Sequence, residues 1–166
     1  MKRNPTLYLT RGALIAAMYV ALTYVAALFG LSSGAIQFRL SEMLCILPFF
    51  IPEATVGLAV GCLISNILTG CYFWDVIFGT VATLIGALGA QMLRRIPKKL
   101  TFVATIPTVV SNAVIVPLVL IYTYGATEAY PFLMLTVGIG EIVCAGIMGS
   151  VLGYTLHKTA FFKKQE

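Results

Sequence analysis

The stretch DVIFGTVATLIGALGAQML, residues 75–93, is followed directly by RRIPKK, residues 94–99. After Asp75 the run has no charged residue until Arg94, so it is close to the roughly 20 apolar residues that a membrane-spanning helix needs. The basic cluster behind it is typical of the cytoplasmic end of such a helix. The stretch therefore predicts a transmembrane helix that ends in the cytoplasm.

Apolar segments of similar character lie on both sides of this helix. Together they predict six helices joined by short loops, over residues 7–29, 38–50, 54–68, 75–93, 100–122 and 131–157. Because Pro107 and Pro117 lie inside the fifth segment, we expect that helix to be kinked or broken. The expected fold is all-α, a six-helix transmembrane bundle, with residues 1–166 forming a single integral membrane domain.

The composition agrees with lipid as the main solvent. The chain is 60% hydrophobic and only 10% charged, whereas soluble domains carry roughly 25% charged residues. Its net charge of +5 is gathered in short clusters between apolar segments, not on a basic face interleaved with aromatic residues. This pattern argues against nucleic acid as a partner and in favour of a membrane topology signal.

The basic residues predict an orientation. Placing both termini in the cytoplasm puts ten of the eleven Lys and Arg residues on that side and leaves only Arg39. The ten are Lys2, Arg3, Arg11, Arg94, Arg95, Lys98, Lys99, Lys158, Lys163 and Lys164. We therefore expect a multi-pass protein of the cell membrane with N- and C-termini inside.

A few charged residues remain at the outer side or inside the bilayer, where each is costly and so a functional candidate. Arg39 and Glu42 are three residues apart, so they share one helix face. They form a local ion pair that fixes the helix start, or they line an outward-opening pocket together with Gln37.

A second group lies at the same expected depth. Asp75 suits a helix N-cap and Trp74 an interfacial anchor, but both are also placed to join Arg39 and Asn66 in a shared site.

Glu141 is the charged residue hardest to explain by structure alone. It lies near the expected middle of the sixth helix, where the sequence places no basic partner. It is either protonated or faces a polar cavity, and Asn112 on the fifth helix is a candidate neighbour. With Arg39 offset by Glu42, Asp75 and Glu141 would leave the site acidic, which suits a ligand with a cationic amine or several N–H donors.

Small residues mark possible helix contacts. Ala13, Ala17 and Ala21 are spaced by four residues along the first helix, and such a stripe lets another helix approach closely. The stripe suits either docking of a partner subunit or packing within the bundle, whereas internal packing explains Gly57 and Gly61.

Several catalytic motifs are missing from the sequence. There is no GxxxxGK[ST] phosphate loop and no HExxH, and no Ser/His or Cys/His pair is placed for nucleophilic catalysis. We expect no catalytic residue, no cofactor and no metal site. The chain is predicted to bind or conduct.

The strings GAIQFRLSE (34–42), LPFFIPEA (47–54), GCLISN (61–66) and WDVIFGT (74–80) resemble the QueT family of membrane proteins. The family comprises S components of energy-coupling factor (ECF) transporters, assigned to queuosine precursors such as 7-deazaguanine bases. The resemblance implies an S-component-like six-helix fold, an outward-facing binding site and no ATPase of its own. It also implies docking of the alanine stripe on a T component, energy from two ATPase subunits, and delivery by toppling in the bilayer.

The charged and polar residues considered above are the ones we expect to bind the substrate: Gln37, Arg39, Glu42, Asn66, Trp74, Asp75, Asn112 and Glu141. Glu141 or Glu42 would accept from the donor edge of a deazaguanine, and Asp75 would meet an aminomethyl cation. Alternatives left open are an S component or small carrier for another nucleobase or a vitamin, a solitary channel, and an intramembrane enzyme.

Overall fold

The computed structural model describes residues 5–30 and 38–159, and every regular element within these ranges is helical. The main elements are α1 (Pro5–Leu28), η1 (Leu40–Phe49), α2 (Ala54–Leu68), α3 (Phe73–Met92), α4 (Thr101–Tyr124), α5 (Tyr130–Glu141), η4 (Ile142–Met148) and α6 (Gly149–Lys158). Two short turns, η2 (Leu93–Arg95) and η3 (Lys98–Leu100), join α3 to α4. Since α5, η4 and α6 are consecutive parts of one apolar segment, the described chain has six helical segments and confirms the expected all-helical bundle.

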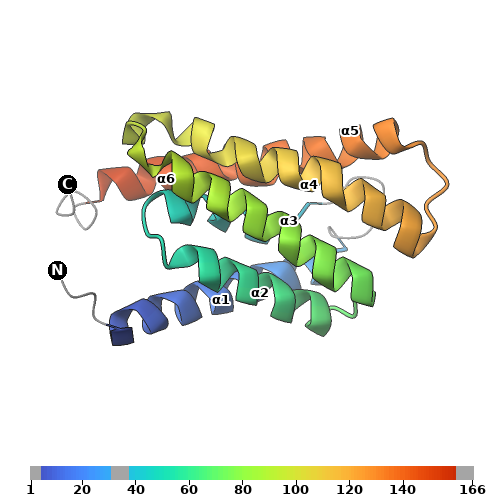
Figure 1. The fold of residues 1–166 in the computed structure, drawn as a ribbon, viewed down its shortest axis with the longest axis horizontal. Helices are drawn as coiled ribbons and strands as arrows, with labels where there is room; N and C mark the ends of the chain where they lie inside the picture. Colours follow the sequence, from blue (N-terminus) through green and yellow to red (C-terminus); the bar gives the residue numbers. More distant parts are fainter. Residues whose placement is uncertain (1–4, 31–37, 160–166) are drawn as a thin grey trace.

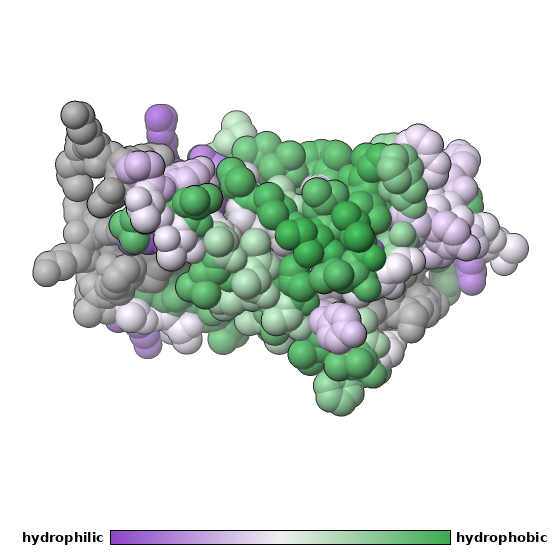
Figure 2. Space-filling model, turned by 90° about the horizontal axis from the view of Figure 1, so that it is seen from below, coloured by the Kyte–Doolittle hydropathy of each residue, from purple (hydrophilic) through white to green (hydrophobic). Residues whose placement is uncertain are grey.

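The surface of the bundle is that of a membrane protein. Four segments are long and apolar enough to cross a bilayer: Pro5–Leu28, Phe73–Arg95, Thr101–Tyr124 and Tyr130–Lys158. Large apolar side chains are exposed on these segments, including Leu14, Leu135 and Val151. A protein surface in contact with water does not carry so many. Figure 2 shows hydrophobic residues concentrated across the middle of one face, with hydrophilic residues toward both ends. The chain is therefore a multi-pass membrane protein.

The ends of the helices sort into two groups along the long axis. In Figure 1, α1 begins and α6 ends at the same end of the bundle, and the α3–α4 connection with its arginines lies there too. An ion pair of 3.1 Å between Arg11 and Glu53 links α1 to the start of α2. The α2–α3 and α4–α5 turns lie at the opposite end, where Gly70 and Gly125 adopt positive φ angles of 73° and 69°.

The segment expected as a helix over residues 38–50 is a 3₁₀ helix, η1, of 10 residues. At about 2.0 Å per residue it is roughly 20 Å long, which is less than the roughly 30 Å of a hydrocarbon core. Most of its side chains are fully buried, including Leu44, Cys45 and Phe49. The surrounding helices shield its backbone from lipid, so η1 is a buried helix at the centre of the bundle and not a lipid-facing span.

Glycines set the closest helix contacts. A Cβ at Gly57 would lie 2.5 Å from the carbonyl oxygen of Gly12, and one at Gly61 would lie 2.9 Å from that of Ala16. Such close contact with the α1 backbone is possible because positions 57 and 61 of α2 carry no side chain, so the predicted internal packing role of Gly57 and Gly61 is confirmed.

Residues 100–122 were expected to form a kinked or broken helix, and the break does not occur, because α4 runs without interruption from Thr101 to Tyr124 through Pro107 and Pro117. The ring of Pro107 occupies the space beside Gly89 of α3, where an added Cβ would be 2.4 Å from its Cβ. Tight packing against α3 therefore holds the helix together where two prolines remove backbone donors.

Candidate functional site

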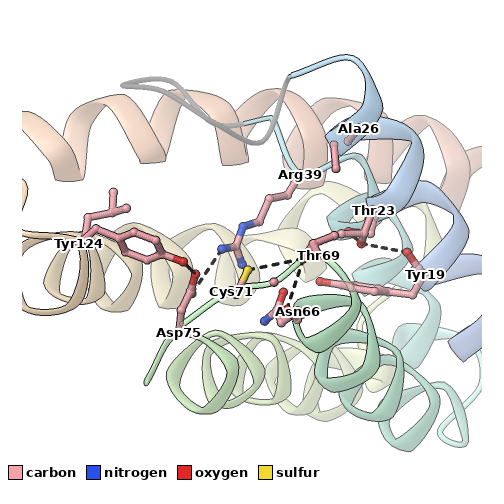
Figure 3. A pocket seen from close by; sticks show the side chains of 13 residues that line it. Tyr19, Thr23, Ala26, Arg39, Asn66, Thr69, Cys71, Asp75 and Tyr124 are labelled. Carbon is pink, nitrogen blue, oxygen red and sulfur yellow. Dashed lines mark hydrogen bonds and ion pairs between the residues drawn. The ribbon is translucent and has the colours of Figure 1, made fainter. Parts of the chain in front are cut away.

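A cavity of about 430 Å³ opens between α1, α2, α3, α4 and the residues just before η1. It lies toward the end of the bundle that carries the α2–α3 turn, away from the chain ends (Figures 1 and 3). Its lining comprises Tyr19, Thr23, Ala26, Ala27, Arg39, Ser41, Asn66, Thr69, Gly70, Cys71, Asp75, Leu120 and Tyr124. Small, aromatic and polar side chains thus share one enclosed space, which is typical of small-molecule sites.

An ion pair crosses this cavity. Arg39 Nη2 lies 3.7 Å from Asp75 Oδ1, with the two side chains only 15% and 8% exposed. The Tyr124 hydroxyl donates a 2.7 Å hydrogen bond to Asp75 Oδ2. At 3.7 Å the ion pair is longer than a hydrogen bond, so N–H groups of the guanidinium can turn toward a ligand. Figure 3 shows Arg39 reaching from the side of Thr23 toward Asp75 and Tyr124.

The expected ion pair between Arg39 and Glu42 does not form. Arg39 precedes the first turn of η1 with φ −89° and ψ 85°, so its side chain leaves the helix direction and meets α3. Glu42 lies inside that first turn and points into the core. The two side chains therefore separate although they are three residues apart.

Asn66 is the third polar group of the wall and is 5% exposed. Its Nδ2 lies 3.6 Å from the Cys62 sulfur, which is a weak acceptor. The Asn66 amide therefore has most of its hydrogen-bonding groups available to a ligand in the cavity.

Glu42 is the hub of a buried polar cluster beneath the cavity. It is fully buried, and its carboxylate accepts from the Tyr19 hydroxyl at 2.5 Å, Thr83 at 3.1 Å, Cys45 at 3.1 Å and Asn112 at 3.4 Å. These donors come from four helices, so the carboxylate ties the bundle together. Tyr19 is part of both the cluster around Glu42 and the cavity wall, because its side chain also lines the cavity.

Glu141 and Asn112 bring unused acceptors into the interior. Glu141 is 3% exposed, and its Oε2 has no hydrogen-bond partner in the described chain; the same holds for Asn112 Oδ1. The π-helical segment η4 starts directly after Glu141, and such segments often accompany functional sites. Neither side chain lines the cavity, so both would have to act from beneath its floor.

Other expected residues lie elsewhere. Gln37 falls outside the part of the chain that the structure describes. Trp74 is 55% exposed and points away from the cavity, stacked on Phe78 at 6.0 Å between ring centroids. It neighbours Asp75 in the sequence, but one residue step turns a helix by about 100°, so the two side chains diverge. The alanine stripe of Ala13, Ala17 and Ala21 is exposed on the outside of α1.

The cavity-lining residues that the sequence did not single out are mainly Tyr19, Thr23, Ser41, Thr69 and Cys71. On α1 a signal was available, since Tyr19 and Thr23 are four residues apart on a face distinct from the alanine stripe. Thr23 also shares a 2.9 Å hydrogen bond with Ser41, which follows Arg39 and was not predicted.

The chemistry of this cavity is recognition. Within residues 5–30 and 38–159 no three His, Cys, Asp or Glu side chains come together to hold a metal. Arginine supplies donors, aspartate supplies acceptors, asparagine supplies both, and tyrosine rings offer flat surfaces. Such a set fits a small planar molecule with mixed donors and acceptors.

Comparison with known proteins places the chain among transporters. Residues 9–158 match the family model described as QueT transporter. A relative from Lactococcus lactis subsp. cremoris (strain MG1363), named Queuosine precursor transporter QueT, is 42% identical over 86 residues. That alignment covers 51% of this chain and 50% of the relative, so the chain spans about half the length of the protein it matches. No solved structure gives a significant match.

Proposed function

Because the chain belongs to the QueT transporter family, we propose that it is the substrate-binding membrane subunit of an importer for a queuosine precursor. The Lactococcus relative is named for a queuosine precursor, and we take the substrate of this chain to be a 7-deazaguanine-type base or a related compound. The observation that carries the proposal is the cavity of about 430 Å³, in which Arg39, Asn66 and Asp75 converge among aromatic and small side chains.

The size and lining of the cavity suit such a base. Its volume falls within the range of about 300–1,000 Å³ that small-molecule sites occupy. A deazaguanine is planar and carries a carbonyl acceptor, a ring N–H and an exocyclic amine along one edge. Tyr19 and Tyr124 would provide ring surfaces, while Arg39, Asn66 and Asp75 would meet the polar edge.

Residues beneath the cavity would support this contact. Glu42, Asn112 and Glu141 form a deeper polar layer, and Tyr19 connects Glu42 to the cavity wall. In this proposal the layer holds Tyr19 in place and offers spare acceptors to donor groups that reach past it. Gln37 remains a predicted contact because it directly precedes the Phe38–Arg39 segment.

The proposed orientation places both termini in the cytoplasm of the cell membrane. It is supported by the positive-inside rule, because the arginines of the α3–α4 connection lie at the same end of the bundle as the start of α1 and the end of α6. The cavity lies toward the opposite end, and so would receive substrate from outside the cell.

Transport would take its energy from partners. The sequence has no phosphate-binding loop, so we propose an ECF T component and two ATPase subunits as the motor. Ala13, Ala17 and Ala21 are exposed on α1, which has the smallest buried share of the four long helices, 22% against 33%, 44% and 50%. In the proposed cycle this stripe docks on the T component, and the bundle topples to deliver the substrate.

A thermal-shift screen of the purified chain in detergent tests the proposal. A 7-deazaguanine base should raise the unfolding temperature with a saturable dependence on its concentration, whereas unrelated vitamins should not. Stabilisation by a vitamin or an unrelated nucleobase, with no response to any deazaguanine, would contradict it.

A further inference from the structure

Three polar atoms of the cavity wall surround the bare Cα of Gly79. A Cβ at this position would lie 3.0 Å from Asn66 Nδ2, 3.4 Å from Asp75 Oδ1 and 3.6 Å from Arg39 Nη1. Two N–H groups and one carboxylate therefore converge over this glycine, because position 79 has no side chain to keep them apart. We call this cluster of three polar side-chain ends over Gly79 the Gly79 notch.

The fold assembles the notch from three elements. Asp75 and Gly79 are four residues apart on α3, so they share a helix face. Asn66 comes from α2, and Arg39 comes from the residues before η1. Gly79 is buried, yet it has a negative φ and sits mid-helix, where glycine costs stability relative to alanine. The missing side chain therefore makes room at the site and serves no turn.

The Gly79 notch differs from the glycine contacts that pack helices. At Gly57 an added Cβ would strike the backbone of Gly12, which cannot yield. At Gly79 the neighbours are the ends of flexible side chains that belong to the cavity wall. An alanine at position 79 is thus compatible with folding, but its methyl group would push the Asn66 amide and the Asp75 carboxylate away from the positions in which they face a ligand.

We propose that the Gly79 notch recognises a lactam edge of the substrate, that is, a ring carbonyl beside a ring N–H. This inference rests on the proposed function and adds to it the part of the molecule that is recognised. The carbonyl oxygen would accept from Arg39 and Asn66, and the ring N–H would donate to Asp75. The 3.7 Å separation of Arg39 and Asp75 leaves both groups able to make these bonds.

The pattern gives a defined specificity. A base with an amine in place of the carbonyl presents a donor to Arg39 and Asn66, and its adjacent ring nitrogen presents an acceptor to Asp75. The contacts with Arg39 and Asp75 would then pair like with like, and a polar site rejects such a mismatch strongly because its buried groups stay unpaired. The notch should therefore distinguish 6-oxo from 6-amino ligands of otherwise equal shape.

The test measures binding of two probes, a 7-deazaguanine base and its 2,6-diamino counterpart, by calorimetry on the full chain in detergent. Wild type should prefer the 6-oxo probe at least tenfold, and Gly79→Ala should weaken that probe at least tenfold. Gly138→Ala is the matched control, because its Cβ meets only Ala113 at 3.7 Å on α5. Gly138→Ala should change affinity less than about twofold.

Asp75→Asn should reduce the 6-oxo preference below about threefold, since an amide can donate or accept.

The outcomes separate the two proposals. If wild type binds neither probe, the proposed function fails. If wild type binds the 6-oxo probe but Gly79→Ala binds it equally well, or if wild type shows no 6-oxo preference, the lactam inference is overturned while the proposed function stands. The unfolding temperature of ligand-free Gly79→Ala should stay within about 3 °C of wild type. A larger fall would mean that Gly79 is a packing glycine, which would also overturn the inference.

Discussion

Replacing Asp75 by asparagine removes one charge of the ion pair that crosses the cavity. The two side chains are 15% and 8% exposed and 3.7 Å apart, so at an effective dielectric constant of 20 their attraction is about 4 kcal/mol. Removing one partner of a buried pair costs about 3–5 kcal/mol because the other charge stays buried alone. We expect about 3 kcal/mol here, since the separation allows no direct hydrogen bond and the cavity can admit water.

A double-mutant cycle isolates this interaction. Asp75→Asn, Arg39→Gln and the double variant are compared by thermal unfolding in one detergent, where 3 kcal/mol corresponds to a fall of about 6–12 °C. The double variant should be less destabilised than the sum of the single ones, with a coupling energy of about 1–3 kcal/mol. Strictly additive effects, with a coupling below about 0.5 kcal/mol, would refute the ion pair as the organising feature of the wall.

A second ion pair provides a matched control. Arg11 and Glu53 are 3.1 Å apart and 24% and 12% exposed, and neither lines the cavity. The same cycle at this pair should also show coupling in stability but leave ligand affinity within about twofold of wild type. Loss of ligand affinity at both pairs alike would indicate a general loss of structure and not a local site.

Three further perturbations test other parts of the account. Glu141→Gln should weaken binding of a 7-deazaguanine base at least tenfold by calorimetry while the unfolding temperature is kept, because the carboxylate oxygen Oε2 has no hydrogen-bond partner in the described chain and is proposed to accept from the ligand; wild-type affinity would remove Glu141 from the site. Ala17→Trp should abolish co-purification with the T component but spare ligand binding, because a large side chain blocks close helix approach; normal recovery of the complex would exclude the stripe as the docking face. Gly57→Ala should lower the free energy of unfolding by about 1–3 kcal/mol, because its Cβ would meet the Gly12 carbonyl at 2.5 Å. Gly138→Ala should change it by less than about 0.5 kcal/mol, and equal effects of the two substitutions would contradict the packing account.

Helix positions were accessible from the sequence because the bilayer imposes a simple rule. Apolar segments must be helical and their ends are marked by charges and turns, so the expected range 54–68 coincides with α2. The 3₁₀ geometry of η1 was not accessible in this way. It follows from burial among the surrounding helices, which replaces lipid as the environment of that segment.

The sequence predicted which side chains line the site better than it predicted how those side chains pair with one another. Arg39, Asn66 and Asp75 were chosen because polar groups in a bilayer are costly, and all three line one cavity. Spacing alone assigned Arg39 to Glu42, but the backbone before η1 directs it to Asp75. Tyr19 was missed because its only signal in the sequence is the four-residue spacing from Thr23, whereas its hydrogen bond to Glu42 is seen only in the structure.

The most direct test of the central claim is mass spectrometry of small molecules that co-purify with the chain from membranes of cells growing on a queuosine precursor source. The account predicts a 7-deazaguanine-type compound in near-stoichiometric amount with wild type, and its loss with the Gly79→Ala variant. A different bound compound, or no bound deazaguanine with wild type, would contradict the assignment of the cavity as the site of capture. Equal amounts of the deazaguanine with wild type and Gly79→Ala would overturn the lactam inference alone.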